Sequence, residues 1–178
     1  MRRLLKLVAV LVVLGTGAGC GYALAGRGNA LPATIKTIGV PLFVNRSTTP
    51  EIDRSLTSAV LQEFQSRGRY QVKSEAAGVD AVLTGTIVNV LLPPVAFSRE
   101  NQATRILIIV TASLEFKEVS TGRVIWANPS FQVRDEYDVT TGTSATDPTA
   151  LFRQDQNALD RLSRSFARSV VASIFEAF

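Results

Sequence analysis

Histidine is absent from this 178-residue chain, and there is only one cysteine. Without histidine, neither a Ser-His-Asp nor a Cys-His catalytic set is possible, and the commonest metal ligand is missing. A single cysteine also excludes an internal disulfide framework. A Ser-Lys pair remains formally possible, but the lysines that follow the first 19 residues (Lys36, Lys73 and Lys117) sit in no known pairing motif. We therefore expect a protein that is not an enzyme and has no cofactor.

A long hydrophobic run is missing as well. Arg2, Arg3 and Lys6 lead into an apolar stretch, Leu7 to Leu14, which has at most about a dozen residues even when counted from Leu4, whereas a membrane-spanning helix needs about 20. A basic tip, a short apolar run and then small residues are the layout of a secretory signal peptide. We therefore interpret residues 1–19 as a signal peptide.

The single cysteine follows this segment directly. Gly17-Ala18-Gly19-Cys20 resembles a bacterial lipobox, in which the cysteine thiol is acylated, for example with palmitate, and becomes the mature N-terminus. Gly17 departs from that pattern, which usually has leucine there, so an ordinary signal peptide with a stray cysteine is the alternative. Gly21 stands where inner-membrane lipoproteins often carry aspartate, which favours the outer membrane. Residues 20–34, rich in glycine and alanine, are predicted to be a lipidated tether.

The net charge of +4 says little about nucleic acid. Three of the 19 basic residues lie in residues 1–19, which leaves 16 against 15 acidic residues. Nucleic-acid binding favours basic residues clustered with aromatic ones, and Arg67, Arg69 and Tyr70 are too few. We expect no nucleic-acid partner.

The first half of the remaining chain predicts strands around one helix. Apolar residues alternate over residues 35–44, where Pro41 interrupts the strand. Residues 50–67 have helical spacing, with Thr49 as the expected cap and Gly68 after the end. Short and long strands are expected at 69–74 and 80–92. The strand at 80–92 is apolar on both faces, which predicts a central strand that is covered on both sides at least in part. Gly85 within it suggests a bulge or a close backbone approach.

The second half predicts a hairpin followed by a helix. Residues 103–117 alternate most regularly, and a turn at 118–122 leads into a return strand. The apolar positions of that strand change parity near Pro129, which predicts a β-bulge there. Residues 148–177 have the spacing of a long amphipathic helix. Its polar face carries Arg153, Asp155, Asp160, Arg161, Arg164 and Arg168.

This order predicts an α/β (α+β) fold in a single domain at 35–178. The architecture is a two-layer sandwich, with two helices on one face of a mixed four- to five-stranded sheet. The long strands are expected to run past the helices and to leave an apolar surface open.

Few residues offer binding chemistry. Asp135, Glu136 and Asp138 are the only acidic cluster, but neighbouring strand positions point to opposite faces, so we expect no metal site. Arginine and lysine on a sheet can hold phosphates. We select Arg105 and Lys117 as candidate contacts for an anionic ligand from their positions, against the alternative that they are simply solvated.

Several segments resemble one known family, the lipopolysaccharide-assembly lipoproteins (the LptE family). The resemblance covers the mature chain in order. It rests on Cys20-Gly21-Tyr22-Ala23-Leu24, Val40-Pro41-Leu42-Phe43-Val44-Asn45-Arg46-Ser47, Leu56-Thr57-Ser58-Ala59-Val60, Arg67-Gly68-Arg69-Tyr70-Gln71-Val72 and Asp80-Ala81-Val82-Leu83-Thr84-Gly85-Thr86-Ile87. Similar strands occur in other envelope lipoproteins, including the curli-secretion type.

The resemblance implies a function. Such a lipoprotein is anchored on the periplasmic side of the outer membrane, plugs an LptD-like β-barrel translocon and assists its assembly. It also binds lipopolysaccharide (LPS) during delivery to the outer leaflet, and Arg105 and Lys117 would then be candidate LPS contacts. The alternative is an envelope lipoprotein that oligomerises or docks to a secretion machine.

Overall fold

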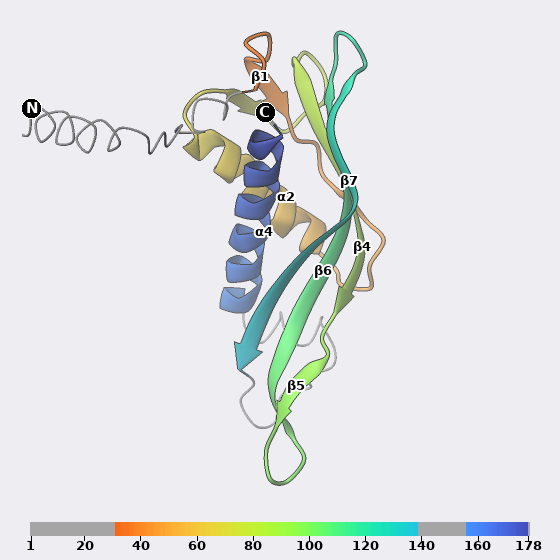
Figure 1. Cartoon of the computed structure of the whole chain (residues 1–178), viewed down its shortest axis with the longest axis vertical. Helices are drawn as coiled ribbons and strands as arrows, with labels where there is room; N and C mark the ends of the chain where they lie inside the picture. The colour runs from red at the N-terminus through yellow and green to blue at the C-terminus, as the bar shows by residue number, and fades with distance from the viewer. Residues whose placement is uncertain (1–30, 139–155, 178) are drawn as a thin grey trace, which may run out of the picture.

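The computed structural model describes residues 31–138 and 156–177. One seven-stranded sheet lies against two helices, which share one of its faces (Figure 1). The elements in order are β1 (Thr37–Gly39), β2 (Val44–Asn45), α2 (Ile52–Ser66), β3 (Gln71–Lys73), β4 (Ala81–Leu91), β5 (Pro94–Phe97), β6 (Ala103–Glu118), β7 (Val124–Asp138) and α4 (Gln156–Glu176). The predicted α+β class is confirmed. The sheet has more strands than predicted, because the first strand is split in two and β5 follows β4.

Strand β6 is the centre of the sheet. It pairs in antiparallel fashion with β4 and β5 on one side and with β7 on the other. Its inward side chains are those predicted by the alternation, and all are buried: Ile106, Ile108, Val110, Ala112, Leu114 and Phe116. In Figure 1 the long strands curve and extend past both helices, as predicted. They leave the large apolar side chains of Val95 and Phe97 half exposed on β5.

The first predicted strand is interrupted at Pro41, as expected. Its two parts, β1 and β2, both run parallel to β4. Between them the chain leaves the ladder, and the Phe43 amide donates instead to the Thr57 hydroxyl of α2 at 3.1 Å. Proline has no amide hydrogen, so the break falls where a ladder hydrogen bond could not form.

The bulge predicted near Pro129 is also confirmed. Ala112 of β6 pairs with Phe131 of β7, but Leu114 pairs with Asn128. Two steps along β6 therefore match three along β7, and the extra residue is absorbed at Pro129 and Ser130. As a result, Phe131 and Val133 point into the core, where both are buried.

The helix start was predicted wrongly. Helix α2 begins at Ile52. The N-cap residue before it, Glu51, lies in the left-handed region (φ 61°), and its side chain makes no capping hydrogen bond. Thr49 does not cap: its hydroxyl is buried and has no hydrogen-bond partner in the described part of the chain. The end was predicted correctly, because Gly68 follows with φ 66°, a conformation that glycine adopts without strain.

Strand β4 is central, as predicted, but only its first half is covered on both faces. Val82 and Leu83 are both buried, whereas Val88 and Leu91 are 47% and 50% exposed. Gly85 marks a close approach: a Cβ there would lie 2.8 Å from Phe43 Cδ1 and 2.9 Å from Leu114 Cδ2.

In the residues that the structure describes, neither helix is long and apolar enough to cross a membrane. Both are amphipathic and turn one apolar face to the sheet.

Asp80, just before β4, accepts hydrogen bonds from the start of β1, and its contribution to the stability of the fold should depend on pH. Its Oδ2 accepts hydrogen bonds from the amides of Lys36 (2.9 Å) and Thr37 (2.8 Å) and from the Thr37 hydroxyl (2.8 Å). The Lys36 amide is the largest cause of a pKa below the ordinary value of 3.8, followed by the Thr37 hydroxyl and amide. A lowered folded-state pKa stabilises the fold fully above the unfolded-state pKa, and the contribution is lost as pH falls through the folded value.

We therefore expect Asp80→Ala to destabilise the protein at pH 7, and the difference from wild type to shrink as pH falls below about 4. Urea unfolding of both proteins between pH 7 and pH 2 measures this. A difference that stays constant with pH would show that the Asp80 charge contributes nothing.

Candidate functional site

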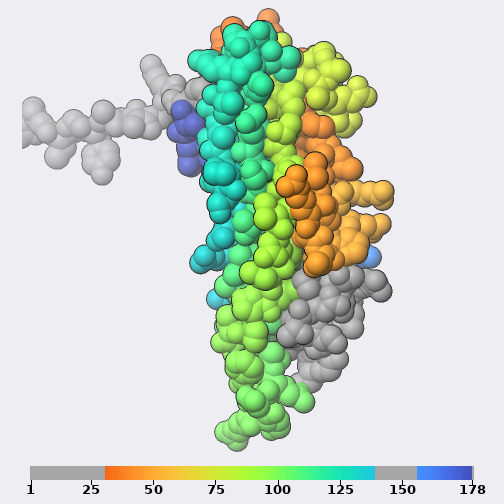
Figure 2. Space-filling view, turned by 90° about the vertical axis from the view of Figure 1, so that its right-hand side faces the viewer, coloured from red at the N-terminus to blue at the C-terminus, as the bar shows by residue number. Residues whose placement is uncertain are grey.

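The side of the sheet opposite the helices carries a central group of hydroxyl and amide side chains, next to the apolar side chains of Leu91 and Ile109. We call this group the polar sheet face: Thr84, Thr86, Asn89, Thr111, Ser113 and Gln132. These residues are neighbours across strands, since Thr111 of β6 pairs with Asn89 of β4 and with Gln132 of β7. Figure 2 shows this side of the molecule, where no helix of the described residues covers the strands. These six side chains are uncharged, so a polar surface that contacts them buries no charge of theirs.

Arg105 lies at one end of the same side of the sheet and is already paired. Its Nε donates to Asp138 Oδ1 at 2.8 Å, and its Nη1 lies 3.5 Å from Glu136 Oε2, both across the ladder on β7. The hydrogen bond with Asp138 raises the pKa of Arg105 above its ordinary value, and the charges of Asp138 and Glu136 add to the effect. An anionic ligand would have to compete with two carboxylates for this guanidinium.

Lys117 lies near the other end of β6, where its side chain is exposed and makes no ion pair with the described residues. It shares the face of Arg105, since their numbers have the same parity on one strand. Twelve residues at about 3.3 Å each separate them by about 40 Å. The structure therefore does not bring the two candidate residues together, and they cannot hold one phosphate between them.

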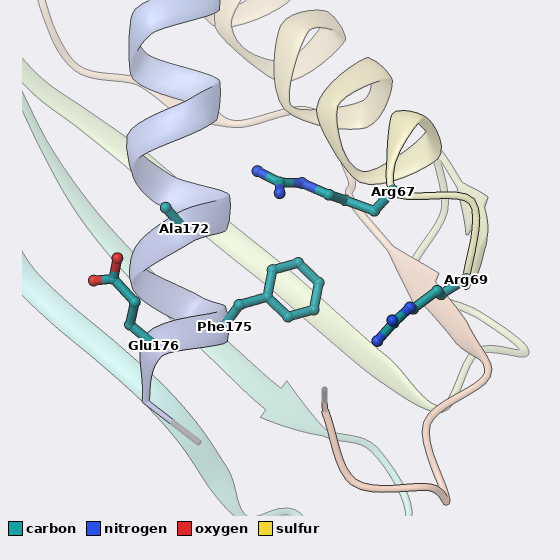
Figure 3. A pocket seen from close by; sticks show the side chains of 5 residues that line it. All are labelled: Arg67, Arg69, Ala172, Phe175 and Glu176. Carbon is teal, nitrogen blue, oxygen red and sulfur yellow. The ribbon is translucent and has the colours of Figure 1, made fainter. Parts of the chain in front are cut away.

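A cleft of about 480 Å³ lies between the C-terminal ends of α2 and α4. Figure 3 shows Phe175 between two arginines, Arg67 and Arg69, with Glu176 turned away from the ring. Arg67 lies 5.9 Å from the centroid of the Phe175 ring and is bonded to Glu63 at 2.8 Å. The Phe175 ring also stacks on Tyr70, whose hydroxyl accepts the Leu31 amide at 3.2 Å.

The acidic residues of β7 are used structurally. Glu136 and Asp138 pair with Arg105, and Asp135 points to the other face. Within residues 31–138 and 156–177, no group of His, Cys, Asp and Glu side chains is placed to hold a metal ion. Cys20, the predicted lipidation site, lies outside the described residues.

Sequence reasoning missed the grooves that the helices form. The polar face of the last helix was recognised from its charges, but a cleft depends on which residues a neighbouring helix presents to it. No local signal in the sequence fixes how α2 and α4 pack against each other.

Comparison with known proteins gives one family. The family model for lipopolysaccharide assembly, LptE, matches residues 35–174. No curated protein matches the sequence.

Among solved structures, protein XCC0632 from Xanthomonas campestris is 14% identical, with a TM-score of 0.50, over 83% of this chain and 90% of that one. The PelC dodecamer from Paraburkholderia phytofirmans is 19% identical, with a TM-score of 0.49, over 81% and 92%. Lipoprotein B from Nitrosomonas europaea is 11% identical, with a TM-score of 0.49, over 85% and 88%. At this level of identity, the likeness to the Xanthomonas protein speaks for the fold alone.

Proposed function

The chain belongs to the LptE family of lipopolysaccharide-assembly proteins, and from this premise we propose that it plugs an outer-membrane β-barrel translocon for LPS. In this proposal it also assists assembly of the barrel and binds LPS on its way to the outer leaflet. The family match carries the proposal, because it extends over residues 35–174 and so includes α2, nearly all of α4 and all the long strands.

The polar sheet face supports the plug. The interior of a large membrane β-barrel is lined by polar side chains and water. A curved sheet that presents threonine, serine, asparagine and glutamine can lie against such a wall and exchange hydrogen bonds with it. The helices cover the apolar core on the opposite side, so the side left to meet the barrel wall is the one with the polar side chains.

The anchor in this proposal is an acylated Cys20 followed by the tether at 20–34, after removal of residues 1–19. The domain at 35–178 then hangs from the periplasmic side of the outer membrane. Stable anchoring requires more than one acyl chain, which a triacylated cysteine supplies. We further propose that the protein catalyses no reaction, in keeping with a family that assembles rather than transforms LPS.

A bulky side chain on the polar sheet face should prevent assembly without unfolding the domain. Thr111 lies in the middle of this face, between Asn89 and Gln132. Tryptophan is well accepted in strands, so Thr111→Trp should leave the melting temperature nearly unchanged. It should lower the amount of β-barrel that copurifies with the tagged protein at least about tenfold, the effect of a loss near 1.4 kcal/mol in binding.

Gln65→Trp is the matched control, because Gln65 is exposed on α2, on the other side of the sheet. This variant should copurify with as much barrel as wild type does. Equal recovery of the barrel with both variants would exclude the polar sheet face as the contact surface.

A further inference from the structure

The exposed face of α4 carries a row of three arginines, of which Arg161 lies over the Tyr137 ring at 5.6 Å from its centroid. Arg161, Arg164 and Arg168 follow at spacings of three and four residues, which places them on one side of the helix. All three are exposed, and none makes an ion pair with any residue in the described ranges. Like charges at this spacing destabilise a helix, so an anion bound to the row would relieve a repulsion that the folded chain otherwise retains.

Beside this row lies a polar cleft between the first turns of α2 and the N-terminal part of α4. We call it the α2–α4 cleft; its volume is about 480 Å³, within the range of small-molecule sites. Arg54 stands on one helix and Arg164 on the other, and among the described residues Asp160 is the acidic one that lines the cleft. Between them lie small or uncharged side chains, including Ser55, Ser58 and Gln62.

A buried hydroxyl without a partner also lines this cleft. Ser163 is 4% exposed, and its Oγ has no hydrogen-bond partner among the described residues. A buried polar atom without a partner destabilises the folded state, so it requires an explanation. Ser163 Oγ is itself covered, so a ligand that brings a hydroxyl or an oxyanion could give it a hydrogen-bond partner only after a small shift of the cleft walls. This observation does not depend on the charge of the arginines.

Arg164 connects the cleft to a second one. On its other side, a cleft of about 330 Å³ lies between α4 and β7 and is lined by Arg161, Arg164, Arg168, Ser165, Asp135 and Glu136. Glu136 is already drawn toward Arg105, at 3.5 Å. A ligand with more than one sugar ring or phosphate can therefore lie across Arg164 and reach both clefts.

We propose that the α2–α4 cleft and the arginine row of α4 bind a phosphorylated saccharide. Guanidinium groups bind phosphate in bidentate fashion, and Arg54 and Arg164 stand on opposite walls of the cleft. Arg54 also lies 3.8 Å from Glu51 Oε1, but both side chains are exposed, so this ion pair is weak and a phosphate can displace it. The serine hydroxyls and the Gln62 amide match the hydroxyls of a sugar ring, and Ser163 lies among them. This inference rests on the proposed function in one respect: it identifies the phosphorylated saccharide as the headgroup of LPS and locates it away from Arg105 and Lys117.

The test measures binding of the full-length, acylated chain in detergent to three probes: LPS, enzymatically dephosphorylated LPS, and phosphatidylglycerol micelles. The double variant Arg54→Gln/Arg164→Gln should bind LPS at least about tenfold more weakly, since a charge-assisted hydrogen bond contributes that much or more. Wild type should also bind dephosphorylated LPS about tenfold more weakly than it binds LPS. The double variant should bind the two probes with nearly equal affinity, because it lacks the arginines that contact the phosphates. Glutamine keeps the helix propensity of arginine, and loss of the Arg164 charge relieves its repulsion with Arg161 and Arg168, so the melting temperature should not fall.

Two single variants complete the test. Ser163→Ala should weaken binding of LPS and raise the melting temperature of the free protein by about 2–4 °C, because it removes the unsatisfied hydroxyl. Arg69→Gln is the control for the loss of one positive charge elsewhere, since Arg69 lines the cleft at the other end of the helices and should not affect binding.

The outcomes separate this inference from the proposed function. If the double variant binds LPS as wild type does, the cleft is not the site, while LPS binding stands. If wild type binds no LPS, LPS binding itself fails, and with it this site. If phosphatidylglycerol binds as tightly as LPS and the double variant loses both, the surface recognises an anionic membrane rather than a saccharide.

Discussion

Replacing Phe166 with alanine should lower the free energy of unfolding by about 3–5 kcal/mol, the range for a fully buried phenylalanine. Phe166 of α4 is 0% exposed, and its ring lies 6.5 Å from that of Phe43 and 5.7 Å from that of Phe131. It therefore joins α4 to the segment between β1 and β2 and to β7. The loss follows from the cavity as well as from the missing apolar contacts, because these neighbours are held by the sheet.

Urea unfolding measures this loss, and Phe97→Ala is a control with the same chemical change. Phe97 is 56% exposed on β5, so its truncation should cost about 1 kcal/mol at most. Similar losses for the two variants would contradict the structure, because they would mean that Phe166 does not hold α4 on the sheet.

Replacing Cys20 with serine should release the protein from the membrane into the periplasm almost completely. Serine keeps the size of cysteine but cannot take the thioether-linked lipid. Residues 21–34 contain no long apolar run that could hold the protein in the membrane instead. Fractionation of cells, with mass spectrometry of the mature N-terminus, measures the effect. Ala23→Ser is the matched control, since it adds a hydroxyl nearby and leaves the thiol, so this variant should stay in the membrane. A Cys20→Ser variant that stays in the membrane with no loss of lipid mass would disprove the lipoprotein anchor.

The parts of the fold that were predicted from sequence are those with a regular period. The alternation of β6 and the helical spacing of α2 placed the core side chains correctly, because each pattern is local and extends over many residues. The parity change near Pro129 even revealed the bulge in β7. The α+β class follows from the order of these elements.

The failures occur where tertiary contacts override a local signal. Thr49 and Pro50 read as a helix start, but Asn45 organises this turn instead: its Oδ1 accepts from the Ser47 amide at 2.9 Å and its Nδ2 donates to the Thr49 carbonyl at 2.7 Å. Strand β5 was missed because Pro93 and Pro94 signal an end, although the ladder with β6 resumes at Pro94.

The candidate binding residues show the same limit. Parity along β6 was enough to place Arg105 and Lys117 on one face, but the pairing of Arg105 with Asp138 depends on the register across β6 and β7. The arginines of α4 were visible in the sequence as a polar face. The cleft beside them was not, because it arises only when α2 presents Arg54 and its small side chains to α4.

The central claim, a plug inside a β-barrel, is tested most directly by purifying the tagged protein from native outer membranes in mild detergent. Mass spectrometry then identifies and quantifies what comes with it. A large β-barrel in near-stoichiometric amount is the result that this account predicts. Recovery of the protein alone, or as a ring of identical subunits, would contradict it and would favour the oligomerising or docking lipoprotein instead.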